Sequence, residues 1–173
     1  KAKQLFNYGS DRVQVLNNPL YSTVYLDLGL MVIEPQIIKD KPYAVIFPAT
    51  THGKEFAASL SAKFNVGLAT DCVAVQAGGD NQIIVRRPVY AGKALSNLTL
   101  NGPGPHILSL RQNTFRGPGP DFSRVGNIEL LDINVSNDQR VLKIREVVKE
   151  TGSQRDITEA RVVVSGGLGM QQP

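Results

Sequence analysis

The sequence predicts an α/β domain with a mostly parallel sheet and added antiparallel hairpins. One indication is the apolar run Ala44 to Phe47, which precedes a polar loop and a helix-spaced apolar pattern. A second is the run His106 to Leu110, which has the length of a buried strand. A third is a pair of strand-like runs, Asp71 to Ala77 and Gln82 to Val89, joined by turn residues 78–81. We therefore expect a strand-helix-strand unit extended by a hairpin.

The stretch from Pro48 to Cys72 is the unit around which the other elements are placed. Thr50 and Thr51 are good N-cap residues for a helix, and Gly53 lets the backbone turn. The apolar residues of this helix recur every four positions, at Phe56, Leu60 and Phe64. One helix face can therefore pack on the sheet. Ligands or partner surfaces usually lie at such a loop, because helix N-termini and free turn amides converge there.

The elements before this unit can also be predicted from the sequence. Residues 1–7 have a helix-compatible composition, and residues 12–16 alternate like a short strand. Asn17 to Pro19 is a helix-start signal, and the helix is expected to run to Pro35. Its β-branched residues and Gly29 leave a strand open as an alternative.

The elements after His106 to Leu110 are strands separated by polar turns. Ile128 to Val135 and Val141 to Val148 are two such predicted strands, and residues 150–154 are typical of a linker. Arg161 to Val164 is a further predicted strand, which runs directly into a glycine loop. Glycines after a parallel strand let backbone N–H groups approach a phosphate or a flavin closely.

The composition excludes several classes of function. The formal charge is +4, but the basic residues are spread along the chain, and the pair Arg86 and Arg87 is more typical of a solvated strand end than of nucleic-acid binding. The single Cys72 rules out an internal disulfide and favours a buried thiol in a reducing compartment. With only His52 and His106 besides, no metal-ligand spacing is present. No apolar run is long enough for membrane insertion.

Phosphate-binding motifs are incomplete. The glycine loop lacks the third glycine of G-x-G-x-x-G, since position 172 is Gln. The loop around Gly53 and Lys54 lacks the first glycine and the Ser or Thr of a P-loop. His52 is either a ligand contact or a solvated loop histidine, and the second is favoured. From the residues alone, function stays open between a nucleotide-binding module and an interaction domain.

The segment Arg86 to Ala94 is typical of a contact surface or a tight packing corner. Pro88 is expected to end ladder pairing, Gly92 permits a positive φ, and Tyr90 offers a flat amphipathic face.

Three stretches together resemble the alpha subunit of electron transfer flavoprotein. Residues 48–72 are similar to that family's A-T-x-x-G-[KR] loop, helix and strand entry. Residues 86–94 resemble its R-P-x-Y-x-G-N-A segment, although Lys93 replaces the usual Asn. Residues 147–170 resemble the join into its FAD domain.

The resemblance implies a Rossmann-like three-layer domain over residues 1–155, with the family's first strand and helix preceding Lys1. Residues 156–173 would begin the C-terminal FAD-binding domain. The implied function is a component of an electron carrier and not an enzyme. FAD would be its cofactor, the beta subunit its partner, and an acyl-CoA-type dehydrogenase and a quinone-linked acceptor its redox partners. The implied location is the prokaryotic cytoplasm or the mitochondrial matrix.

The resemblance also assigns candidate site residues. Residues near the flavin would be Gly166, Gly167, Leu168 and Gly169. Interface or structural-loop residues would be Thr50, Thr51, Gly53, Lys54, Arg87, Pro88, Tyr90 and Gly92. The family usually has a flavin-contacting Arg where this chain has Leu168, so a paralogue without flavin remains an alternative. The other alternative is a stand-alone adenine-nucleotide-binding domain that holds phosphate at Ala49 to Lys54.

Overall fold

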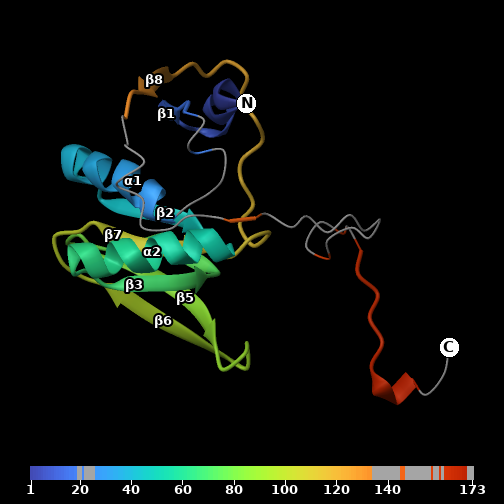
Figure 1. Ribbon diagram of the computed structural model, residues 1–173. Coiled ribbons are helices and arrows are strands. Elements are labelled where there is room, and N and C mark those ends of the chain that lie inside the picture. The colour runs from blue at the N-terminus through green and yellow to red at the C-terminus, as the bar shows by residue number, and fades with distance from the viewer. Residues whose placement is uncertain are drawn as a thin grey trace. The chain divides into compact units, whose positions relative to one another are not determined.

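The computed structural model describes residues 1–18, 21, 26–133, 145–146, 157, 160 and 162–170. The chain divides into two compact units, Lys1–Leu142 and Lys143–Pro173. The elements of the first unit are η1 (Ala2–Tyr8), β1 (Arg12–Leu16), α1 (Leu26–Asp40), β2 (Ala44–Pro48), α2 (Thr51–Phe64), β3 (Leu68–Cys72), β4 (Ala74–Ala77), β5 (Ile83–Val89), β6 (Ala94–Leu100), β7 (His106–Leu110) and β8 (Asn127–Leu131) (Figure 1).

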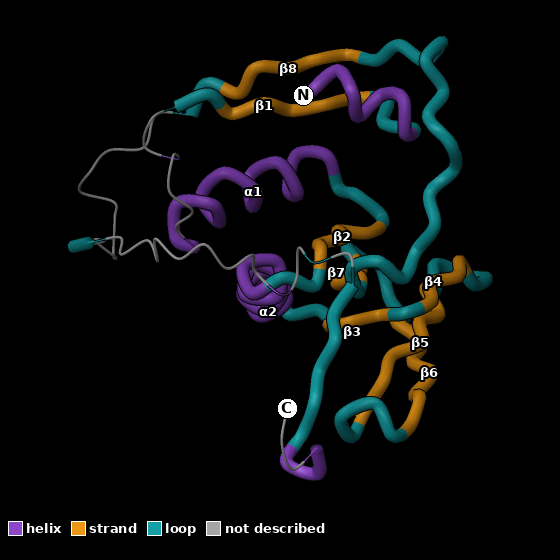
Figure 2. Tube along the Cα trace, turned by 90° about the vertical axis from the view of Figure 1, so that its right-hand side faces the viewer, coloured by secondary structure: helices purple, strands orange, loops and turns teal. Residues whose placement is uncertain are grey.

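The first unit contains parallel and antiparallel sheets, as the sequence predicts for an α/β domain. One parallel sheet has the strand order β2-β7-β3, and β1 pairs in parallel with β8. The antiparallel sheet has the order β4-β5-β6. Helix α1 lies between the β1-β8 pair and α2 (Figure 2).

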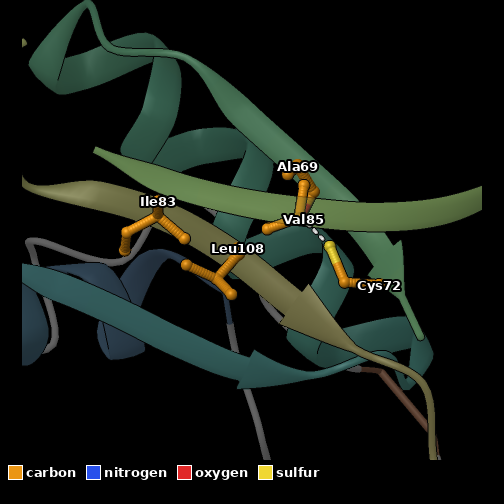
Figure 3. Close-up of a cluster of buried hydrophobic side chains, with 5 residues drawn as sticks. All are labelled: Ala69, Cys72, Ile83, Val85 and Leu108. Carbon is orange, nitrogen blue, oxygen red and sulfur yellow. Dashed lines mark hydrogen bonds between the residues drawn. The ribbon is translucent and has the colours of Figure 1, made fainter. Parts of the chain in front are cut away.

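Strand β7 is the centre of the core. Ile107 packs with Ala57 and Leu60 of α2, whereas the next residue, Leu108, packs on the opposite face with residues of β3 and β5. Both β7 residues are fully buried. Figure 3 shows Leu108 in the second cluster, which also contains Ala69, Cys72, Ile83 and Val85. Helix α2 and the antiparallel sheet therefore cover opposite faces of the parallel sheet, which gives three layers.

Helix α1 confirms the predicted helix and corrects its predicted end. It is a helix, as predicted, and not the alternative strand. At Gly29 it lies close against α2, since a Cβ there would lie 2.3 Å from the Phe56 ring. The helix also continues past Pro35 to Asp40. Ile37, in the turn after the proline, is buried against α2 and β7, and this packing opposes the loss of one backbone hydrogen bond at Pro35. The predicted start at Pro19 lies outside the described residues.

The predicted strand Asp71 to Ala77 is two strands. β3 pairs in parallel with β7 as far as Cys72, after which β4 pairs antiparallel with β5. The break follows an irregularity between Ala69 and Cys72, where Asp71 adopts a positive φ of 60°. The prediction of one strand was wrong because the side chains go on alternating between the two faces where the chain changes its pairing partner, so the sequence pattern does not mark the break.

The expectation that Pro88 ends ladder pairing was also wrong. β5 continues to pair with β6 through Val89 and Ala94, and Pro88 lies opposite Leu95. β4 pairs with β5 only as far as Arg86. At Pro88 the edge of β5 that faces away from β6 therefore has no partner strand, and the missing N–H of proline costs no ladder hydrogen bond there. Strand β6 was not predicted.

The predicted C-terminal strands receive little support in the described residues. β8 ends at Leu131, and residues 134–135 of its predicted range lie outside the described residues. The predicted strand 141–148 also lies outside them, except for Arg145 and Glu146, which belong to no strand. Residues 162–164 form no strand, contrary to expectation, because the described part of the chain gives them no pairing partner. A 3-10 turn, η5 (Leu168–Met170), follows them.

Candidate functional site

Three chain segments meet at the carboxyl edge of the parallel sheet. The turn from β2 into α2 leaves this edge after Pro48, Asp71 lies near the end of β3, and Arg111 directly follows β7. The strand register places Pro48 and Cys72 on either side of Leu110. Because parallel strands end at the same edge, side chains that are distant in the sequence are brought together here.

The turn from β2 into α2 is held by Thr50 and Gly53. Thr50 is the N-cap, as predicted, and its Oγ1 accepts a hydrogen bond of 3.1 Å from the Gly53 N–H. A Cβ on Gly53 would lie 1.9 Å from the Pro48 carbonyl oxygen, so only glycine fits. Thr51 and Lys54 are exposed on the first turn of α2. Thr50 and Gly53 therefore have structural roles, whereas Lys54 is available for contacts.

Asp71 and Arg111 form a bidentate ion pair across the ends of β3 and β7. Arg111 donates from Nε to Asp71 Oδ1 at 3.1 Å and from Nη2 to Oδ2 at 2.6 Å. The Asp71 N–H donates to Oγ of the buried Ser109 at 3.0 Å, which fixes the backbone of Asp71. The hydrogen bond from Arg111 lowers the pKa of Asp71, and the charges of Lys54 and Arg87 lower it further, against desolvation.

A cleft of about 460 Å³ opens beside this ion pair. It is lined by Asp71, Arg87, Pro88, Val89, Tyr90, Ala91, Gly92 and Arg111. Arg87 has its Nε atom buried without a hydrogen-bond partner among the described residues. Tyr90 is 81% exposed at the turn between β5 and β6. The structure thus places the predicted residues Arg87, Pro88, Tyr90 and Gly92 around one cavity.

The cleft also contains two residues that sequence reasoning did not select. Neither Asp71 nor Arg111 was selected as a site residue. The available signal was topological: Arg111 is the first residue after a buried strand, and Asp71 lies at the end of another. A charged residue at that position of a parallel strand points to the ligand-binding edge of the sheet.

The cysteine and the two histidines lie outside this cleft. Cys72 is fully buried, as predicted, and burial raises the pKa of its thiol. His52 is mostly exposed, with its Nδ1 3.5 Å from a Glu55 carboxylate oxygen. His106 is buried, and its Nε2 lies 2.7 Å from the Asn81 carbonyl oxygen. The described residues contain no cluster suited to a metal ion and no helix long and apolar enough to cross a membrane.

A larger groove of about 870 Å³ lies between β1, α1 and β2. Its charged residues are paired, since Arg12 forms an ion pair with Asp40. Most of its other lining residues are apolar. The groove therefore has the volume of a binding site but few unpaired polar groups that could bind a ligand.

The predicted flavin-contacting loop lies in the second unit. Leu168 is fully exposed, and the Met170 N–H donates to the Gly167 carbonyl oxygen at 3.0 Å. A Cβ on Gly167 or Gly169 would meet nothing within 4 Å, whereas one on Gly166 would lie 2.3 Å from the Met170 sulfur. The loop offers open backbone to a ligand and no charged side chain.

Comparison with known proteins identifies the chain's relatives. The model of the electron transfer flavoprotein domain matches residues 1–136. The electron transfer flavoprotein subunit alpha of Bacillus subtilis (strain 168) is 33% identical over 170 residues, covering 98% of this chain and 51% of that protein. Subunit LctC of the lactate dehydrogenase (NAD(+),ferredoxin) of Acetobacterium woodii is 27% identical over 172 residues, covering 99% and 41%. Protein FixB of Clostridium saccharobutylicum is 25% identical over 169 residues, covering 97% and 50%. The chain spans about half the length of these relatives.

Proposed function

The chain belongs to the electron transfer flavoprotein family, and from this premise we propose that it is part of an alpha subunit that scaffolds an FAD-based electron shuttle. The observation that carries the proposal is the family match over residues 1–136, which coincides with the three-layer unit built around β7. Under this proposal the unit acts as a docking and framing domain of an electron carrier, and catalysis belongs to the proteins it serves.

FAD would be held mainly by a further domain that begins near Asp156. Within this chain, residues 166–169 are the proposed flavin contacts. They fit a backbone contact, because an added Cβ at Gly167 or Gly169 would meet nothing within 4 Å, so a flat ring system can approach. When bound, FAD supplies the redox chemistry by accepting and passing on electrons. Leu168 adds no hydrogen-bond donor, so the protein's control over the flavin would differ from that of relatives with Arg at this place.

The proposed partner is a beta-type subunit, which would form a heterodimer with the alpha subunit. The proposed redox partners are an acyl-CoA-type dehydrogenase and a quinone-linked acceptor, with lactate oxidation as a second route because one relative is named as a lactate dehydrogenase subunit. The prokaryotic cytoplasm or the mitochondrial matrix is the proposed location.

The visible absorption spectrum of the full-length protein, co-expressed with its beta-type subunit, tests this proposal. Flavin bands that co-purify with a heterodimer are the expected result. The variant Leu168→Arg tests the contact between the glycine loop and the flavin. Val164→Arg is the matched control, because Val164 is also exposed. Only Leu168→Arg should alter the absorption spectrum or the reduction potential of the flavin. A colourless monomer would refute the proposal and leave the flavin-free scaffold.

The nucleotide-binding alternative has a separate test. Saturating AMP or ATP, at a hundred times its dissociation constant, should stabilise a nucleotide-binding protein by about 2.7 kcal/mol. Differential scanning fluorimetry measures this shift directly. If the nucleotide were held at Ala49 to Lys54, Lys54→Gln would remove most of this shift.

A further inference from the structure

The cleft beside Asp71 carries more positive charge than its one carboxylate neutralises. Asp71 is the only acidic residue among the cleft's lining residues, and Arg111 donates to both of its oxygen atoms. The charges of Lys54 and Arg87 also act on Asp71. Two arginines therefore line the cleft against one carboxylate, and Lys54 adds a positive charge that acts on the same carboxylate. This positive excess attracts an anion into the cavity.

Arg87 supplies an unused donor in this cleft. Its Nε atom is buried and has no hydrogen-bond partner among the described residues. A buried N–H group without a partner is destabilising, and native structures satisfy nearly all of them, so each exception requires an explanation. The neighbouring Arg86 shows the contrast, since its Nε donates to Asn97 Oδ1 at 2.9 Å. A bound acceptor would satisfy Arg87 in the same way.

Backbone strain is concentrated at the same place. Asp71, Tyr90 and Ala91 have φ values of 60°, 52° and 54°, and all three line the cleft. The left-handed region is unfavourable for residues with a Cβ, for Tyr and Ala in particular. Strained residues of this kind persist where the surrounding structure holds them, and they are common at ligand sites.

We propose that this cleft is an oxyanion site in which Arg87 is the principal donor and Arg111 and Lys54 are supporting charges. The planar guanidinium groups suit an acceptor with two or more oxygen atoms, namely a phosphate group or a carboxylate. The cleft lies at the carboxyl edge of the parallel sheet, the usual position of ligands in this class of fold. The inference goes beyond the proposed function and does not depend on flavin.

Isothermal titration calorimetry with inorganic phosphate tests the site in the full-length protein at constant ionic strength. Arg87→Gln should weaken phosphate binding about tenfold or more, the usual worth of a charge-assisted hydrogen bond. Arg86→Gln is the matched control, because this adjacent arginine donates to Asn97 and does not line the cleft, and its binding should equal that of the native protein. Circular dichroism of both variants checks that they fold.

A second measurement does not depend on the stability of any variant. The ¹⁵N resonance of Arg87 Nε in the native protein should shift on addition of phosphate, whereas that of Arg86 should not. Tighter binding of AMP than of phosphate would identify the natural ligand as a small molecule that carries a phosphate group. Binding of acetate as tight as that of phosphate would assign it to a protein carboxylate. No shift of Arg87 with either anion, or equal binding by Arg87→Gln, would overturn the proposal.

Discussion

The β2-α2 turn and the β5-β6 turn both lie beside the carboxyl edge of the sheet, and each contains a glycine that the fold requires for a different reason. Gly53 has no room for a Cβ, which would lie 1.9 Å from the Pro48 carbonyl oxygen. Gly92 has open space around it but a φ of 88°. The first turn is therefore fixed by packing and the second by backbone conformation. The packed turn is suited to support, and the exposed, strained turn to contact.

The largest effect should follow from Gly53→Ala. The new methyl group overlaps backbone atoms that cannot rotate away, so we expect a loss of about 3 kcal/mol in the free energy of unfolding. Urea denaturation measures this loss. Gly79→Ala is the control, since nothing lies within 4 Å of its added Cβ, and it should change stability little. Equal stability of both variants would remove the packing explanation for Gly53.

Gly92→Ala should have a smaller effect, because only the backbone conformation opposes it. A left-handed conformation costs an alanine about 1 kcal/mol relative to glycine. The variant Gly92→Asn should recover part of this loss, since asparagine tolerates the left-handed region. If Gly92→Asn were no better than Gly92→Ala in urea denaturation, the left-handed conformation would not explain the need for glycine at this position.

Thr50→Ala tests the capping part of the packed turn. Loss of the hydrogen bond from the Gly53 N–H should lower the free energy of unfolding by about 1 kcal/mol. Thr51→Ala provides the comparison, because this exposed neighbour is not the N-cap, and thermal unfolding should barely detect it. Equal losses in the two variants would argue against Thr50 as the cap.

Asp71→Asn should have the smallest effect on stability and a specific dependence on pH. The folded protein lowers the pKa of Asp71 below 3.8, so the charged carboxylate stabilises the fold above that pH. This stabilisation disappears as the pH falls through the lowered pKa. The partly exposed pair is worth about 1 kcal/mol or less at neutral pH. Thermal unfolding of both proteins should therefore differ at neutral pH and converge in strong acid, and a difference that persists in acid would contradict this assignment.

The elements with strong local signals were predictable from the sequence. Strands β2 and β7 have short apolar runs, and α2 combines a capping threonine with apolar residues on one face. The division between β3 and β4 was not predictable, because one alternating run serves two pairing partners. The course of β5 past Pro88 depends on how far β4 extends, which no local pattern encodes.

The candidate site was only partly predictable. The segment containing Arg87 and Tyr90 was selected from its composition, and the structure places these residues around one cleft. The ion pair of Asp71 with Arg111 joins residues that are 40 positions apart, so its existence depends on strand order. Sequence reasoning finds such a pair only when it first assigns both strands to neighbouring positions in one parallel sheet.

The central claim, that this chain serves a flavin-based electron carrier, is tested most directly by reducing and reoxidising the full-length protein in complex with its beta-type subunit. The account predicts flavin bands in the visible spectrum that bleach on chemical reduction and return in full on reoxidation. A purified complex without such bands, or with bands that do not return, would contradict it.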